Sequence, residues 1–147
     1  MPDLSRKETY GRYGTHPVYV SETLPASPVT ANSTVYHRLS TPPRGAYFAG
    51  GAISSVVVAS DADGTCLVAL CKYDASASAY VALTTDINLE SLTTLIGQVL
   101  TRIATLTVAQ LTFDTGDSLV LRVVNNSAAV DTQPTFVNVT AELLLKD

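Results

Sequence analysis

The chain is divided into short apolar or alternating segments by turn-forming residues, and this pattern constrains its fold more than any other feature. The breaks between segments are rich in Pro, Gly, Asp and Asn, residues that end strands and form turns. The segments lie at residues 18–24, 35–39, 46–59, 66–73, 80–84, 111–113, 118–124 and 135–146. Strands of this number at short intervals predict an all-β chain that forms a β-sandwich or barrel.

Two of these segments carry further information. Gly50 and Gly51 interrupt residues 46–59, so we expect a bulge or bend between two strand segments there. Residues 66–73 are almost continuously apolar, as in a central strand that is covered on both faces. Residues 80–84 follow a turn of small residues and are expected to pair back onto them as a hairpin.

Residues 86–111 allow two interpretations. Their large apolar residues are spaced by three and four, which favours an amphipathic helix: Leu89, Leu92, Ile96, Val99, Ile103 and Leu106. Gly97 and the threonines at 93, 94, 101, 105 and 107 favour strand instead. We expect a turn or short helix at residues 89–94 and a strand at residues 98–105, with one continuous helix as the alternative.

The composition indicates one domain that packs against other molecules. The 147 residues are 46% hydrophobic and only 15% charged, against roughly 25% charged residues in an average soluble protein. A small β domain solubilised by Ser and Thr would show the same composition. The net charge of −4 argues against a nucleic-acid partner. No apolar run approaches the roughly 18 residues of a membrane span, and no signal peptide is present, so no membrane partner is expected.

The first seventeen residues bury too little apolar surface to fold on their own. They contain two glycines, three basic side chains and two tyrosines. We therefore expect an extended N-terminal arm at residues 1–17 and a β-sandwich domain at residues 18–147. Residues 1–44 carry five basic and three acidic side chains, whereas the rest carries four and ten. A mildly basic arm suits an acidic protein surface, and its expected partner-binding residues are Arg6, Lys7, Tyr10, Arg12 and Tyr13.

The residues that catalysis requires are scarce. His16 and His37 are the two histidines, and neither belongs to a His-x-His or His-x-Asp metal motif. We expect no catalytic residues, no cofactor, no metal and no enzymatic activity. The pair Asp61 and Asp63 resembles half of a calcium loop, as do Asp114 and Asp117 around Gly116, and an Asx turn is the simpler interpretation of both.

The two cysteines, Cys66 and Cys71, lie five residues apart. On a strand this odd spacing places them on opposite faces, too far apart for a disulfide. We expect two buried thiols in a reducing compartment.

The closing segments LTFDTGDSLVLRVVNN and FVNVTAELLLKD resemble the terminal strands of trimeric, tumour-necrosis-factor-like jelly rolls. These occur in the capsid decoration, or cementing, proteins of tailed bacteriophages, and the resemblance covers roughly residues 46–147. It implies an all-β, jelly-roll-like sandwich of about eight strands with an extended arm. It also implies a homotrimer on the capsid exterior of a virion that binds the major capsid (coat) protein, with the arm hooking onto a neighbour.

Two other functions stay open. The first is a phage fibre, neck or receptor-binding protein that recognises another virion protein, or a host glycan through the loops at residues 60–65 and 125–134. The second is a carbohydrate-active or metal-dependent β-barrel enzyme, which the scarcity of histidines disfavours.

Overall fold

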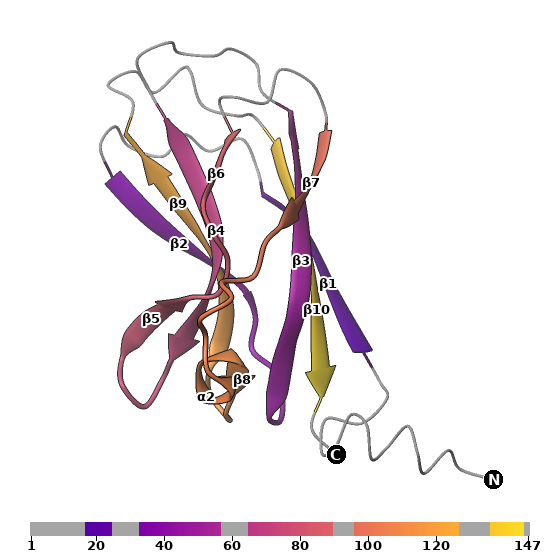
Figure 1. The fold of residues 1–147 in the computed structure, drawn as a ribbon, viewed down its shortest axis with the longest axis vertical. Helices are drawn as coiled ribbons and strands as arrows, with labels where there is room; N and C mark the ends of the chain where they lie inside the picture. Colours follow the sequence, from indigo (N-terminus) through magenta and orange to yellow (C-terminus); the bar gives the residue numbers. More distant parts are fainter. Residues whose placement is uncertain (1–16, 25–32, 57–64, 90–95, 127–135, 146–147) are drawn as a thin grey trace, which may run out of the picture.

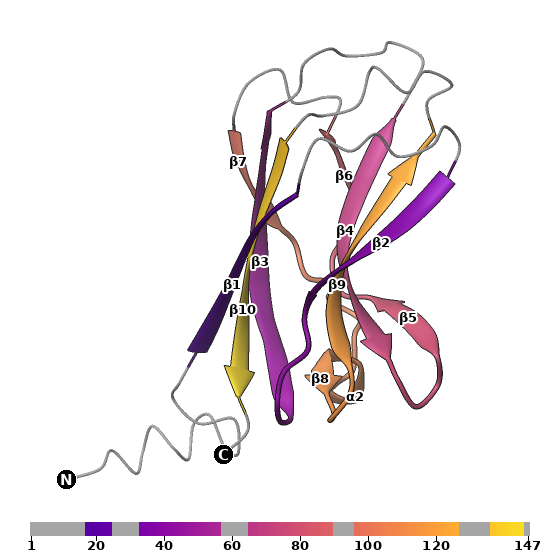
Figure 2. The ribbon, with the colours of Figure 1, turned by 180° about the vertical axis from the view of Figure 1, so that it is seen from behind.

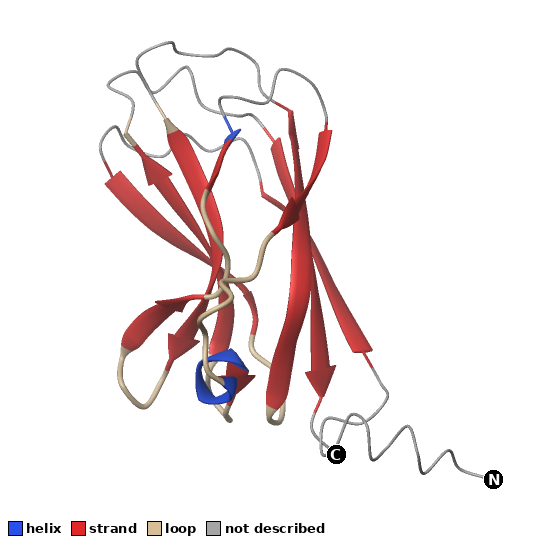
Figure 3. Ribbon diagram, viewed as in Figure 1, coloured by secondary structure: helices blue, strands red, loops and turns tan. Residues whose placement is uncertain are grey.

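Strands are the main elements of the computed structural model, which describes residues 17–24, 33–56, 65–89, 96–126 and 136–145 and has little helix there (Figure 3). The larger strands are β1 (Pro17–Leu24), β2 (Ser33–Ser40), β3 (Ala46–Val56), β4 (Cys66–Asp74), β9 (Ser118–Asn125) and β10 (Phe136–Leu145). The shorter elements are β5 (Ala79–Ala82), β6 (Ile87–Asn88), β7 (Ile96–Leu100), the helix α2 (Val108–Leu111) and β8 (Thr112–Phe113). The all-β prediction is confirmed.

The strands form two antiparallel sheets that face each other (Figure 1). Sheet A has the order β1-β10-β3-β7, with β8 also on β3, and sheet B has the order β2-β9-β4-β5, with β6 also on β4. The pairs β1·β10, β2·β9, β3·β7 and β4·β5 are nested along the sequence. The first and last strands pair with each other, and each following pair lies between the two strands of the pair before it. A long antiparallel hairpin rolled into two sheets has this pairing, which is the jelly-roll topology. The predicted jelly-roll-like sandwich is therefore confirmed.

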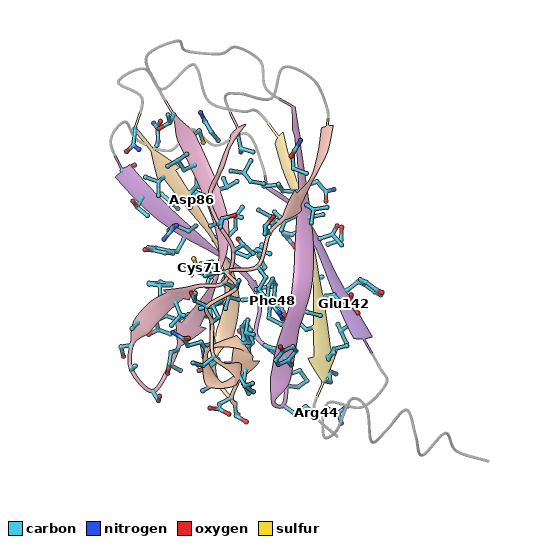
Figure 4. All side chains as sticks on the ribbon, viewed as in Figure 1. Arg44, Phe48, Cys71, Asp86 and Glu142 are labelled. Carbon is cyan, nitrogen blue, oxygen red and sulfur yellow. The ribbon has the colours of Figure 1, made fainter. Side chains whose placement is uncertain are left out.

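The core lies between the two sheets and is filled by alternate residues of each strand. Phe48 of sheet A is fully buried in this space (Figure 4), and Leu70 and Leu121 face it from sheet B. Neighbouring residues on each strand point to opposite faces of their sheet. Side chains one position away from the core residues therefore lie on the outer face of each sheet.

Gly51 lies where the backbone of sheet A packs tightly against a side chain of sheet B. A Cβ atom built on Gly51 would stand 2.6 Å from Leu70 Cδ1 on the opposite sheet and 3.1 Å from the carbonyl oxygen of Thr140. A Cβ atom on Gly50 would meet no atom within 4 Å. The register between β3 and β10 shifts beside Gly50, opposite the step from Glu142 to Leu143. The bulge that the two glycines predicted is confirmed.

Residues 96–111 differ in part from the sequence prediction. A strand is present at Ile96–Leu100, which excludes one continuous helix, but it ends before residue 105. After Leu100 the chain crosses towards sheet B, where the Thr101 carbonyl accepts a hydrogen bond from the Thr85 amide and Ile103 N–H donates to the Leu83 carbonyl. The predicted turn or helix at residues 89–94 lies outside the described residues, apart from Leu89.

The helix α2 was not predicted. Thr107 caps it by accepting a hydrogen bond from the Gln110 amide, while the Gln110 side chain accepts one from the Thr107 amide. This is a capping box. Lys72, almost fully buried on β4, donates to the carbonyl oxygens of Ala109 (3.1 Å) and Thr112 (2.9 Å). The ammonium group thus holds the C-terminal end of α2 against sheet B, beside the β4–β5 hairpin (Figure 2).

Candidate functional site

Most of the site residues predicted from sequence lie outside the described residues. The predicted arm and its division from the domain at residue 17 remain predictions, although Pro17 is the first residue of β1. The following predicted features also fall outside: Arg6, Lys7, Tyr10, Arg12, Tyr13, His16, Asp61, Asp63 and most of the loops at residues 60–65 and 125–134.

Asp117 is a buried structural carboxylate. One of its oxygens accepts a hydrogen bond from the Ala75 amide and the other accepts one from the Asp114 amide, both at 2.9 Å. Gly116, between the two acids, has a φ of +97°, the left-handed conformation that glycine adopts without strain. Asp117 therefore joins two neighbouring turns, as the Asx-turn interpretation of this segment predicts.

No group of three His, Cys, Asp or Glu side chains with metal-binding geometry occurs within the described ranges. His37, half-buried on β2, pairs with Leu121 in the sheet. None of the described helices has the length and apolar character needed to cross a membrane.

Cys66 and Cys71 are both buried free thiols, as predicted. Cys66 belongs to the core between the sheets, whereas the register places Cys71 on the outer face of sheet B, beside Val120 and Ala82. Burial raises the pKa of the Cys71 thiol to about 11, although the nearby positive charge of Arg122 acts in the opposite direction. The thiol is therefore protonated and unreactive at neutral pH.

Three tyrosines from separate strands meet on the outer face of sheet B. Tyr36 of β2 stacks on Tyr80 of β5 with ring centroids 3.7 Å apart and an interplanar angle of 10°. Tyr73 of β4 lies tilted against Tyr80 at 5.1 Å. Tyr36 and Tyr80 remain 38% and 45% exposed, so this aromatic cluster is accessible to a ligand.

The cluster borders a half-open hollow of about 210 Å³. We call it the tyrosine hollow, and it is lined by Tyr36, Arg38, Tyr73, Tyr80 and Val120. Arg38 is exposed and forms no ion pair with any described residue. Arg122, on the same face, is instead paired with Asp86 at 2.6 Å. This pairing and the charge of Asp86 raise the pKa of Arg122, although burial acts to lower it.

The outer face of sheet A has a different character. Its described positions carry one charged side chain, Glu142, on the side turned away from sheet B (Figure 4). Tyr19 on β1 and Val99 on β7 are 65% and 75% exposed at opposite edges of the sheet. Between these edges, next to Tyr19, lies a mainly apolar hollow of about 220 Å³ over Gly50 and its neighbours. We call the whole outer surface of sheet A, from Tyr19 to Val99 and including this hollow, the sheet A face.

Neither surface was identified from the sequence. Tyr19 and Tyr36 could equally have been ordinary strand residues or interface residues, and the sequence did not link Tyr36 to Tyr73 or Tyr80. A detectable signal existed, because Tyr36 and Arg38 occupy alternate positions of one strand. Tyr47 on β3 accepts a hydrogen bond from Arg102 at 3.2 Å.

No protein-family model matches the chain, and no curated protein matches it. Among solved structures, it is similar to a chain of the cyanophage Pam1 capsid asymmetric unit, with 15% identity, a TM-score of 0.47, and coverage of 88% of this chain and 84% of that chain. It is also similar to a chain of infectious bursal disease virus, Gx strain, with 13% identity and a TM-score of 0.32, covering 89% of this chain and 37% of that chain. Both TM-scores lie below 0.5, so the function is inferred from this chain's own residues.

Proposed function

We propose that this protein is a non-enzymatic structural subunit of a virion that binds across the coat subunits of a phage capsid and stabilises the shell. The observation that carries the proposal is the sheet A face, a sheet surface with exposed Tyr19 and Val99 and one charged side chain at its described positions. Few charged side chains together with an exposed aromatic side chain are typical of the surfaces that proteins bury in interfaces. Jelly rolls are an established architecture of capsid domains, and this supports the proposal by analogy of fold.

The core of the sandwich also favours a structural role. A metal-dependent enzyme of this architecture would place metal ligands between its sheets. Here that space holds fully buried apolar side chains from both sheets, among them Phe48, Val68, Leu70, Leu121 and Val139.

The predicted arm would extend the contact made by the sheet A face. Residues 1–16 precede β1, which forms an edge of sheet A, and Tyr19 stands on that edge strand. In this proposal the sheet A face lies on one coat subunit and the arm, anchored through Tyr10 and Tyr13, reaches a neighbour. Binding at many equivalent positions then stabilises the shell by mass action.

The test is binding of the purified protein to empty shells of coat protein from the same virus, measured by co-sedimentation. Replacing Tyr19 and Val99 together with serine should weaken binding tenfold or more, because it removes the contact area of two side chains that are 65% and 75% exposed in the free protein. Tyr80→Ala, which removes an exposed aromatic ring from the other sheet, is the matched control and should bind normally. If the variant with both Tyr19→Ser and Val99→Ser binds the shells as well as the parent protein, the sheet A face is not the shell-binding surface.

The arm and the oligomer need separate measurements. Deleting residues 2–16 leaves β1 intact and should leave a folded domain that no longer saturates the shells. Sedimentation equilibrium should give three times the chain mass if the protein is the proposed homotrimer. If the protein without residues 2–16 still occupies all of its sites on the shells, the proposal that the arm hooks onto a neighbouring coat subunit is wrong.

A further inference from the structure

The geometry points to a second binding site on this protein: the tyrosine hollow binds a sugar unit that carries a carboxylate group. The site lies on the outer face of sheet B and is independent of shell binding by the sheet A face. All of its described lining residues lie on the strands of sheet B, whereas the alternative considered from the sequence placed glycan recognition on the loops at residues 60–65 and 125–134.

The packing of sheet B fixes the aromatic rings in place. β2 and β5 are opposite edge strands, separated by β9 and β4, so their backbones stand about 14 Å apart at ~4.8 Å per strand. Tyr36 and Tyr80 nevertheless stack on each other, so both rings extend inward across the sheet. This is sterically feasible because the outer positions of the intervening strands include small side chains such as Ala69 and Cys71.

The rings are therefore already in contact with one another before any ligand arrives. Tyr80 is held by Tyr36 and by Tyr73. A ligand that binds these rings does not have to order them, which removes one of the usual entropic costs of association.

The polar groups of the hollow match a sugar. A pyranose presents an apolar face of C–H groups and a rim of hydroxyls that both donate and accept hydrogen bonds. A tyrosine offers an aromatic ring and a hydroxyl that also donates and accepts. None of the three tyrosine hydroxyls forms a hydrogen bond with another described residue, so all three are available to a ligand.

Arg38 adds the requirement for a negative charge. Its guanidinium presents a planar set of donors that binds a carboxylate through two parallel hydrogen bonds. None of the described residues that line the hollow is a carboxylate, and Asp86 on the same face is already bound to Arg122. A neutral sugar would leave Arg38 unpaired in the complex.

The size of the hollow favours a single sugar ring over a peptide. Its volume of about 210 Å³ is below the roughly 300–1,000 Å³ typical of sites for drug-sized ligands. An aspartate or glutamate side chain from a protein partner could pair with Arg38 but would leave the aromatic surface and the hydroxyls unused. An acidic sugar uses all of these groups together.

The experiment is a titration of the full-length protein with D-glucuronate, followed by saturation-transfer NMR and calorimetry. D-glucose and acetate are the matched probes that carry only the ring or only the carboxylate. Glucuronate should bind in the millimolar range, as expected for a ligand of this size, and more tightly than either matched probe. Arg38→Gln should weaken glucuronate binding ten- to a hundredfold and leave glucose binding unchanged. Tyr80→Ala should weaken the binding of both sugars.

Two substitutions serve as controls because they remove the same chemistry elsewhere. Arg44→Gln removes another exposed arginine, which Figure 4 shows at the end of the sandwich, and Tyr19→Ala removes an exposed tyrosine from sheet A. Both variants should bind glucuronate like the parent protein.

Absence of glucuronate binding would overturn the sugar site. Equal affinity for glucuronate and acetate would also overturn it, and would indicate a docking point for acidic protein side chains. Binding that survives both Arg38→Gln and Tyr80→Ala would place the ligand elsewhere and also overturn it.

Discussion

Replacing Gly51 with alanine tests how closely the two sheets pack. The new methyl group would stand 2.6 Å from Leu70 Cδ1 and 3.1 Å from the Thr140 carbonyl oxygen. The favourable separation of two carbon atoms is about 3.5–4.0 Å, so one sheet must move or Leu70 must leave its rotamer. Leu70 is fully buried, and the carbonyl belongs to the backbone of β10, so neither contact is relieved freely.

The expected magnitude combines two opposing effects. Adding a methyl group to a well-packed core costs about 1–3 kcal/mol. Replacing a strand glycine with alanine recovers about 0.5–1 kcal/mol, because the unfolded chain loses conformational freedom. The net loss of unfolding free energy should therefore be about 0–2.5 kcal/mol, and a central value of about 1 kcal/mol lowers the melting temperature by roughly 3–4 °C in a domain of this size.

Urea unfolding followed by circular dichroism measures the effect, and Gly50→Ala is the matched control. A methyl group on Gly50 meets no atom within 4 Å, so this variant should keep or slightly raise the unfolding midpoint. A Leu70→Val background removes the clashing δ carbon, and Gly51→Ala should cost clearly less there than in the parent. If Gly51→Ala and Gly50→Ala unfold at the same urea concentration, the proposed close contact between the sheets is wrong.

Three further substitutions test other buried groups. Lys72→Met should cost about 1–3 kcal/mol in urea unfolding and raise amide exchange in α2, because two carbonyls lose their charged donor. Asp117→Asn should cost about 1–3 kcal/mol, because one of its two bound amides loses its acceptor, whereas exposed Asp114→Asn should change stability little. The pKa of Cys71 is raised by burial from an ordinary 9.0 to about 11, so stability should be lost as the pH rises from 9 towards 11. That loss should shrink in Cys71→Ala, measured by urea unfolding across this pH range.

Local patterns explain which parts of the fold were predictable. Alternation and turn residues located the main strands, since both signals reside in neighbouring residues. The helix α2 was missed although Thr107 and Gln110 have capping-box spacing, because four residues are too few to show helical periodicity. The predicted strand at residues 98–105 ended early because residues 101–103 bond to residues 83–85, between β5 and β6, a partner that no local pattern reveals.

The sequence by itself determined the all-β class, the bulge at Gly50 and Gly51, the two buried free thiols and the sparse surface charge. Each depends on residue type or on spacing along one strand. Tertiary structure alone decided the nested pairing of the strands and the contact of Gly51 with Leu70. It also decided the meeting of Tyr36 with Tyr80, which are 44 residues apart in the chain. Such contacts depend on how two sheets roll and pack, and this packing is a property of the whole core.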